Sequence, residues 1–156
     1  MNITMLEALN QAMDEELAFD ENVVIIGGGL TGCEIAYDLF LQGKKPTIVE
    51  MKQDLIAASG VCLANSSYLR DFFTLNKIPV YLDTKIHEVF SDGVALISKE
   101  GTIENIKADS VILAAGYTQA PVFPGSGKKV QVVGDAKKVG NLRTVIWSAW
   151  DAAMKL

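Results

Sequence analysis

The sequence predicts an α/β fold of the Rossmann-like, three-layer ββα class, with a central parallel sheet and an antiparallel three-stranded meander. Apolar segments in the order β-α-β-α-β occupy residues 22–82, and short alternating segments follow at 85–107. A further apolar strand is expected at 110–116. Strands that alternate with helices form parallel sheets, whereas short alternating segments joined by tight turns are typical of antiparallel hairpins.

Periodicity and turn residues define the elements of the first half. The helical spacing of Leu6, Leu9, Met13 and Leu17 predicts an amphipathic helix at the N-terminus. Gly43 can close the second helix as a C-terminal cap, and Pro46 is tolerated at the beginning of a strand. The expected elements are a helix at 4–18, a strand at 22–26, a helix at 30–42, a strand at 45–50, a helix at 61–76 and a strand at 80–82.

Turn residues also divide the second half. The meander comprises segments 85–90, 93–98 and 102–107, separated by Ser91-Asp92-Gly93 and Lys99-Glu100-Gly101. After a loop with Pro121, Pro124, Gly125 and Gly127, a strand is predicted at 130–133 and a last helix at 141–155. An unpaired apolar strand favours association, so we expect strand 130–133 to pair with another strand.

The first strand ends in a G-x-G-x-x-G motif that opens the second helix. The motif reads Gly27-Gly28-Gly29-Leu30-Thr31-Gly32. Gly27 permits the tight turn, Gly29 leaves room for a pyrophosphate, and Gly32 lets the helix lie close on the sheet. The helix N-terminus favours negative charge, so the phosphates of a dinucleotide are expected there.

The second strand ends on an acidic residue, Glu50, which lies eighteen residues after Gly32, close to the usual spacing of about 20. Its carboxylate is expected to accept hydrogen bonds from the adenosine ribose. An acid disfavours a 2′-phosphate and no Arg is nearby, which favours NAD(H) over NADP(H). Lys52 keeps NADP(H) open, and FAD, which contains the same ADP group, remains an alternative.

Composition excludes several classes of function. A formal net charge of −5 argues against nucleic-acid or anionic-membrane surfaces, and no apolar run has the length of a membrane span. The N-terminus lacks the pattern of a signal peptide. Cys33 and Cys62 form no C-x-x-C, and no metal-ligand spacing is visible, so a cytoplasmic setting without a bound metal is expected.

Four segments together resemble a known family. They are Gly27–Glu34, Val49-Glu50-Met51, Ala114-Ala115-Gly116-Tyr117 and Val133–Lys138. Their combination resembles the NAD domain of NADH:flavin oxidoreductases of the 2-enoate reductase and 2,4-dienoyl-CoA reductase type, within the pyridine nucleotide-disulfide oxidoreductase superfamily. Val139 departs from this pattern, because relatives usually have Pro there.

The resemblance implies a division of the chain. Residues 1–21 would be an N-terminal helix and linker, 22–116 the NAD-binding domain, and 117–156 a strand and helix that end an FAD domain. The chain is then expected to be a C-terminal fragment that binds NAD(H) but does not complete a catalytic cycle. FAD would be shared with a missing domain, and FMN and an iron–sulfur cluster would belong to absent parts. The remaining flavin domains are expected partners, and a homo-oligomer is possible.

The same resemblance implies a set of cofactor-binding residues and no catalytic acid or base. The set is Gly27, Gly28, Gly29, Leu30, Thr31, Gly32, Glu34, Glu50, Met51, Ala115, Gly116, Gly134 and Asp135. Ala115 and Gly116 would edge the cofactor cleft, and Gly134 and Asp135 would lie at the flavin phosphate or ribityl chain.

Several of these residues have a plainer interpretation. Glu34 either lies near the nicotinamide or complements the helix dipole, and Asp135 is either a flavin contact or a helix N-cap. Cys33 is expected to be a small buried helix residue, and His87 to lie on a solvated strand. Trp147 and Trp150 are expected to be packing residues. The alternative function is a stand-alone nucleotide-binding or regulatory module without turnover.

Overall fold

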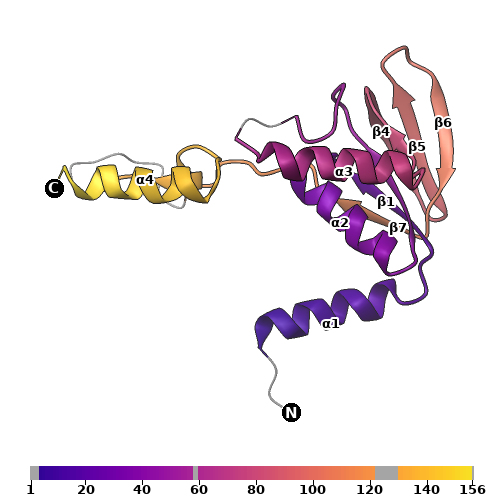
Figure 1. The fold of residues 1–156 in the computed structure, drawn as a ribbon, viewed down its shortest axis with the longest axis horizontal. Helices are drawn as coiled ribbons and strands as arrows, with labels where there is room; N and C mark the ends of the chain where they lie inside the picture. Colours follow the sequence, from indigo (N-terminus) through magenta and orange to yellow (C-terminus); the bar gives the residue numbers. More distant parts are fainter. Residues whose placement is uncertain (1–3, 58–59, 122–129, 156) are drawn as a thin grey trace. The chain divides into compact units, whose positions relative to one another are not determined.

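A computed structural model describes residues 4–57, 60–121 and 130–155. The chain forms two compact units, Met1–Ala115 and Gly116–Leu156. Figure 1 shows the elements of each unit, and the two units are described separately below.

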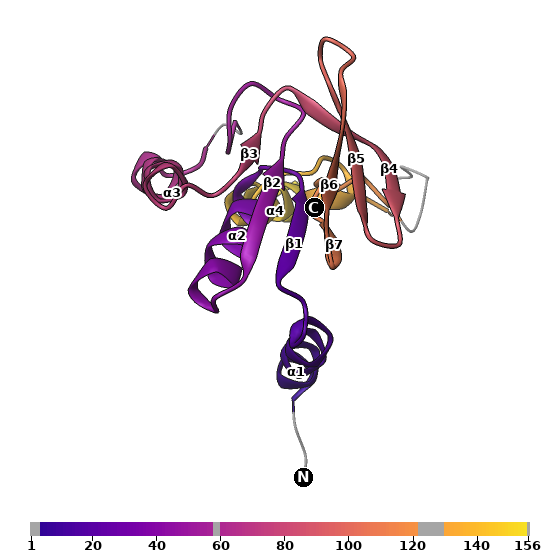
Figure 2. The ribbon, with the colours of Figure 1, turned by 90° about the vertical axis from the view of Figure 1, so that its right-hand side faces the viewer.

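The first unit contains a parallel sheet with the order β3-β2-β1-β7. Its strands are β1 (Asn22–Ile26), β2 (Lys45–Val49), β3 (Val80–Tyr81) and β7 (Ser110–Leu113). Each neighbouring pair is parallel, and Figure 2 shows the four strands side by side in this order. The carboxyl ends of all four strands therefore meet at one edge of the sheet.

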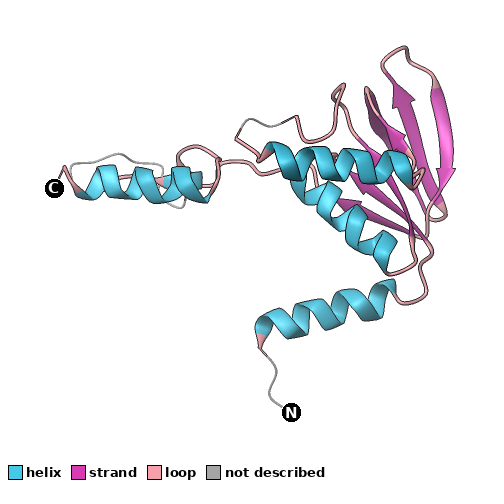
Figure 3. Ribbon diagram, in the orientation of Figure 1, coloured by secondary structure: helices cyan, strands magenta, loops and turns pink. Residues whose placement is uncertain are grey.

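The helices of the first unit are α1 (Met5–Leu17), α2 (Leu30–Leu41) and α3 (Leu63–Leu75). Helices α2 and α3 cover one face of this sheet, the meander covers the other, and α1 extends away from it (Figure 3). The antiparallel meander consists of β4 (Thr84–Phe90), β5 (Gly93–Ser98) and β6 (Ile103–Lys107), in the order β4-β5-β6. The predicted three-layer ββα fold is confirmed.

Alternating side chains of β1 build two separate cores. Val23 and Ile25 pack in a cluster with Ala36 of α2 and Phe73 of α3. Val24 points to the other face and packs in a cluster with β5. A strand that is buried on both faces must be apolar at every position, which explains the uninterrupted Val-Val-Ile-Ile run.

Helix α1 begins with a capping box. The Thr4 hydroxyl accepts a hydrogen bond from the Glu7 N–H, and the Glu7 carboxylate accepts one from the Thr4 N–H. At the other end, the Lys44 ammonium donates to the carbonyl oxygens of Leu17 and Ala18. The predicted helix is confirmed; of its apolar stripe, the side chains of Leu6, Leu9 and Met13 lie outside the described part.

The second unit contains a 3-10 turn, η1 (Gly134–Ala136), and helix α4 (Leu142–Ala153). The predicted last helix is confirmed, with Asn141 and Thr144 forming its capping box. The predicted strand at 130–133 is wrong, because in the described part of this unit only Val130 has bridge-type pairing. A strand needs partners for its N–H and C=O groups, and the turn at Gly134 follows at once. Residues 122–129 of the predicted loop lie outside the described residues.

A smaller difference concerns the start of α3. The third helix begins at Leu63 rather than 61, and Cys62 is its N-cap residue instead of lying within it. Among the helices that the structure describes, none has the length and apolar character needed to cross a bilayer.

Asp109 ties the end of the meander to the start of β1, and we expect this contact to be pH-dependent. Its Oδ2 accepts hydrogen bonds from the N–H groups of Asn22 and Glu21, at 2.8 and 3.0 Å. The bond from the Asn22 backbone is the main cause that lowers the pKa of Asp109 below its ordinary 3.8. Asp109→Ala should therefore lower the midpoint of urea unfolding at pH 6.

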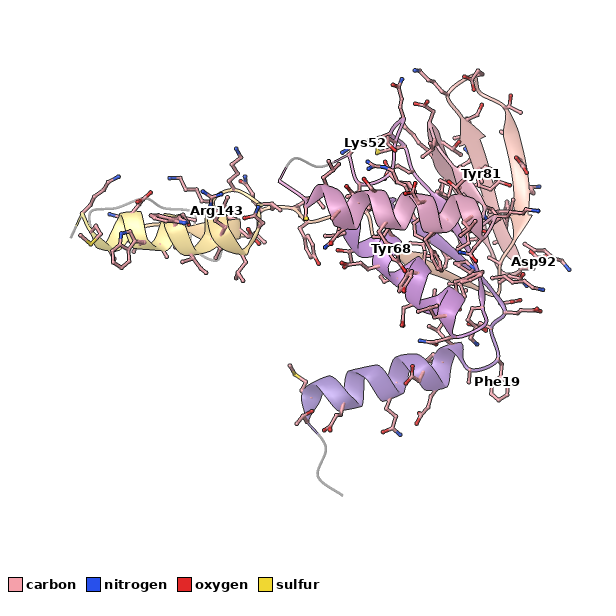
Figure 4. The ribbon with its side chains drawn as sticks, in the orientation of Figure 1. Phe19, Lys52, Tyr68, Tyr81, Asp92 and Arg143 are labelled. Carbon is pink, nitrogen blue, oxygen red and sulfur yellow. The ribbon has the colours of Figure 1, made fainter. Side chains whose placement is uncertain are left out.

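The expected pH dependence follows from the direction of this pKa shift. A carboxylate with a lowered folded-state pKa stabilises the fold above its unfolded-state pKa, and this contribution is lost as the pH falls through the folded value. The difference between wild type and Asp109→Ala should thus shrink below about pH 3.8. Asp92→Ala, in the exposed β4–β5 turn (Figure 4), is the matched control. A difference that is independent of pH would contradict the assignment.

Candidate functional site

The turn between β1 and α2 is held by backbone contacts that leave no space for side chains. Gly27 has φ +112°, and a Cβ added there would lie 2.4 Å from the carbonyl oxygen of Ala114. A Cβ on Gly32 would lie 1.9 Å from the carbonyl oxygen of Gly27. Strand β7, the turn and helix α2 are therefore in direct backbone contact. This is the geometry that the first and third glycines of the motif were expected to provide.

Gly29 differs from these two because the space beside it is open. It is the N-cap residue of α2, and its φ of −69° is ordinary for any residue. Apart from its chain neighbours and the adjoining helix backbone, no atom of the described residues lies within 4 Å of the position of a Cβ. No side chain caps the helix, and within the described residues the N–H groups of Gly29, Leu30 and Thr31 have no hydrogen-bond partner. Free N–H groups at a helix N-terminus bind anions.

The Glu50 carboxylate lies beside this turn and is buried, with 7% of the residue exposed. Its Oε2 accepts a hydrogen bond from the Gly28 N–H at 2.7 Å, and its Oε1 accepts one from the Lys52 N–H at 2.8 Å. Each carboxylate oxygen has a further lone pair for another donor. The acidic residue therefore braces the glycine turn and keeps acceptor capacity for a ligand.

Gly28 is enclosed by residues that sequence reasoning missed. The Ile56 N–H donates to the Gly28 carbonyl at 2.7 Å, and a Cβ on Gly28 would lie 2.5 Å from a methyl group of Leu55. Gly28 occupies the x position between the first two glycines of G-x-G-x-x-G, and the motif places no limit on the size of the side chain there. The spacing of residues gives no signal for Leu55 and Ile56, because their contact depends on how the chain turns after β2.

Arg70 of α3 holds that turn and was also missed. Its Nε and Nη2 donate to the two carboxylate oxygens of Asp54 at 3.0 and 2.9 Å, and Nη2 also donates to the Leu55 carbonyl. An ion pair between a loop and a helix has no characteristic spacing, so the sequence could not indicate it.

Other predicted residues lie around the same edge or away from it. Ala115 follows β7, whose extension is fixed by the bond from the Ala114 N–H to the Ile26 carbonyl at 2.8 Å. Met51 is exposed next to Glu50. Glu34 is exposed on α2 and lies beyond its first turn, where the helix dipole has little effect. Its interpretation as a dipole partner is therefore wrong.

Gly116, Gly134 and Asp135 belong to the second unit. Asp135 accepts a hydrogen bond from the Gly140 N–H at 3.0 Å, and α4 is capped by Asn141. The alternative interpretation of Asp135 as the N-cap of the last helix is therefore wrong.

The two tryptophans of α4 do not pack within their own unit as described. Trp147 and Trp150 are 57% and 59% exposed, and α4 has no buried residue. The second unit by itself therefore does not bury them in the way that the prediction of packing residues requires. Their apolar surface is available to another part of a protein.

Of the two cysteines and the histidine, Cys33 is buried and the other two are exposed. Cys33 is fully buried under the glycine turn, and its Sγ lies 3.4 Å from the Gly28 carbonyl. Burial, followed by the negative charge of Glu50, raises the pKa of Cys33 to about 12. Neither Cys33 nor the exposed Cys62 is paired. His87 is exposed on β4, as expected. In the described ranges no group of three or more His, Cys, Asp or Glu could hold a metal.

Residues 2–147 match the family model of the pyridine nucleotide-disulphide oxidoreductases. The chain belongs to this family. The match includes the glycine turn and Glu50, so the candidate site lies within the matched residues.

Similar curated proteins are larger oxidoreductases. Cinnamate reductase of Clostridium sporogenes is 38% identical over 141 residues, which cover 87% of this chain and 21% of the relative. NADH oxidase of Thermoanaerobacter brockii is 37% identical over 144 residues, which cover 88% of this chain and 22% of the relative. The chain thus spans about a fifth of the length of these relatives.

Solved structures agree with this assignment. A 2-naphthoyl-CoA reductase complex matches 87% of this chain and 21% of its own chain, with a TM-score of 0.72 and 25% identity. Histamine dehydrogenase from Rhizobium sp. 4-9 matches 87% of this chain and 23% of its own, with a TM-score of 0.70. Its identity of 14% supports the fold alone.

The two cysteines should differ sharply toward alkylation. A thiol reacts as its thiolate, so buried Cys33 with its raised pKa should stay unmodified while exposed Cys62 reacts. Mass spectrometry of the native protein after iodoacetamide treatment at pH 8 should find one carbamidomethyl group, on Cys62. Cys62→Ser should abolish the labelling. Labelling of Cys33 without unfolding would contradict its buried position.

Substitutions at two glycines of the motif should affect different properties, one the stability of the fold and the other ligand binding. Gly32→Ala places a methyl group against the Gly27 carbonyl and should destabilise the fold by about 2–4 kcal/mol. Gly29→Ala meets open space and should leave the free energy of unfolding within about 1 kcal/mol, while it weakens binding of an anionic ligand. Urea unfolding and ligand titration of both variants provide the check. Equal destabilisation by the two substitutions would contradict the geometry.

Proposed function

We propose that the chain is the NAD(H)-binding domain of a flavin-dependent, 2-enoate reductase-like oxidoreductase. It positions NADH for hydride transfer to a flavin, which the remaining domains of the enzyme hold for the most part. The observation that carries the proposal is the open, N–H-lined space at Gly29 beside the buried carboxylate of Glu50.

The residues of this edge fit a dinucleotide. The N–H groups of Gly29, Leu30 and Thr31 face the pyrophosphate, with Gly32 keeping α2 close to the turn. Glu50 accepts hydrogen bonds from the adenosine ribose, and Met51 flanks the ribose. When bound, the nicotinamide supplies the hydride, so this chain contributes binding and orientation and need not contribute an acid or base.

Charge favours NADH over NADPH. The Glu50 carboxylate is buried and already accepts two backbone hydrogen bonds, and a 2′-phosphate next to it would be repelled at short range. Lys52, labelled in Figure 4, is exposed and is the nearby cation in sequence that favours the phosphate. NADPH is therefore the weaker ligand in this proposal rather than an excluded one.

The names of the relatives support the NADH and reductase parts of the proposal. The names of the relatives include an NADH oxidase and reductases of cinnamate and 2-naphthoyl-CoA. Because the chain spans about a fifth of these proteins, we assign FMN, an iron–sulfur cluster and most of the FAD site to parts outside this chain. Ala115 and Gly116 then edge the cofactor cleft, Glu34 lies toward the nicotinamide, and Gly134 and Asp135 contact the flavin. A cytoplasmic location accords with two unpaired cysteines.

Calorimetric titration of the full chain with NADH, NADPH, FAD and ADP tests this proposal. NADH should bind most tightly. Glu50→Ala should cost about 1–3 kcal/mol of binding free energy, because the ribose hydroxyls lose an acceptor. Glu88→Ala, an exposed acid on β4, is the control and should bind NADH like the wild type.

Two results would overturn the assignment. Wild-type chain that binds no adenine dinucleotide would remove the proposed function. Tighter binding of FAD than of NADH, with a yellow purified protein, would assign the same site to the flavin instead.

A further inference from the structure

We propose that Arg70 is a positioning residue for the dinucleotide site. Residues 27–32 and 54–56 together are called the cradle. Arg70 holds residues 54–56 and, through them, the peptide between Gly28 and Gly29. The proposal rests on the proposed function, because it assigns a role at the same site. Arg70 lies on α3 and does not belong to the glycine motif.

The contacts that start at Arg70 end at one peptide plane, the peptide between Gly28 and Gly29. The Gly28 carbonyl accepts hydrogen bonds from the Ile56 N–H at 2.7 Å and from the Cys33 thiol at 3.4 Å. The Gly28 carbonyl and the Gly29 N–H belong to the same planar trans unit, in which they point in opposite directions. Fixing the carbonyl toward Ile56 therefore fixes the direction of the Gly29 N–H, which lies at the open end of the cradle.

Ile56 is not held there by its own backbone preference. Its φ is +52°, a left-handed conformation that is uncommon for a β-branched residue and costs free energy. The side chain is buried, with 3% exposed, and so is that of Leu55. The turn therefore depends on tertiary contacts to keep the Ile56 N–H in place.

Arg70 supplies the polar part of those contacts. Two guanidinium nitrogens bind both oxygens of Asp54, and one of them also binds the Leu55 carbonyl. This grips the turn on both sides of the Asp54–Leu55 peptide. A lysine ammonium is a point charge that cannot reproduce this two-pronged geometry, so the arrangement requires arginine specifically.

A purely stabilising ion pair is the alternative explanation, and the structure offers a matched control. The Arg70 and Asp54 side chains are 31% and 58% exposed, and pairs at such exposure contribute little to stability. Lys45 and Glu21 form a more exposed ion pair at the other end of β2, with side chains that are 66% and 60% exposed. If Arg70 acted only as a surface ion pair, Arg70→Gln should leave the affinity for NADH unchanged, as Lys45→Gln should.

The first experiment measures NADH binding by fluorescence titration of the full chain. Arg70→Gln should raise the dissociation constant for NADH about three- to tenfold, because a smaller share of the molecules has the cradle formed. Arg70→Lys should not restore the affinity, and Asp54→Asn, which removes the negative charge of the pair at an exposed loop position, should also weaken binding. Lys45→Gln should bind like the wild type, and the thermal midpoints of Arg70→Gln and Lys45→Gln should be similar.

The second experiment needs no ligand. In the nucleotide-free protein, NMR hydrogen exchange of the Ile56 amide should be faster in Arg70→Gln than in the wild type, and unchanged in Lys45→Gln. Affinity that is unchanged in Arg70→Gln, or restored by Arg70→Lys, overturns the positioning role. If the wild type binds no dinucleotide, the proposed function fails, while the Ile56 exchange rate still decides whether Arg70 holds the turn.

Discussion

The close approach of helix α2 to the carbonyl oxygen of Gly27 is the constraint on which the rest of the first unit depends. No side chain larger than hydrogen fits at Gly32, where a Cβ would lie 1.9 Å from that oxygen. The approach brings the helix N-terminus to the carboxyl end of β1, next to β2 and β7. The uncapped N-terminus of α2, the acidic end of β2 and the end of β7 thus share one edge of the sheet.

The Rossmann-like fold was predictable because its signals are local or periodic. Val23–Ile26 is apolar at every position because β1 is buried on both faces, and the glycines mark where the backbone passes within contact distance of other backbone. The meander was visible from its Asp92-Gly93 and Glu100-Gly101 turns. Each of these signals depends on residues that are close in sequence, so a reading of one chain can find them.

What the sequence could not reveal depends on tertiary structure. The brace on Gly28 combines Leu55 and Ile56, after β2, with Arg70 on α3, and nothing in their spacing relates them. The strand expected at 130–133 failed for the opposite reason. Its apolar pattern, Val130 to Val133, suits a strand, but a strand forms only where a neighbour offers hydrogen bonds. Likewise, Trp147 and Trp150 look like core residues in sequence, yet the second unit does not bury them.

The left-handed backbone of Ile56 also limits how well the glycine motif would keep its geometry when it is transferred to another protein. A βαβ segment ending at Val49 would contain the strand, the turn and the helix, but it would omit one wall of the cradle. That wall has an unfavourable conformation of its own at Ile56, and its Leu55 carbonyl accepts a hydrogen bond from Arg70 of α3. Transplanting G-x-G-x-x-G into another scaffold would therefore transfer the bend without the peptide orientation, unless an equivalent of α3 were transplanted with it.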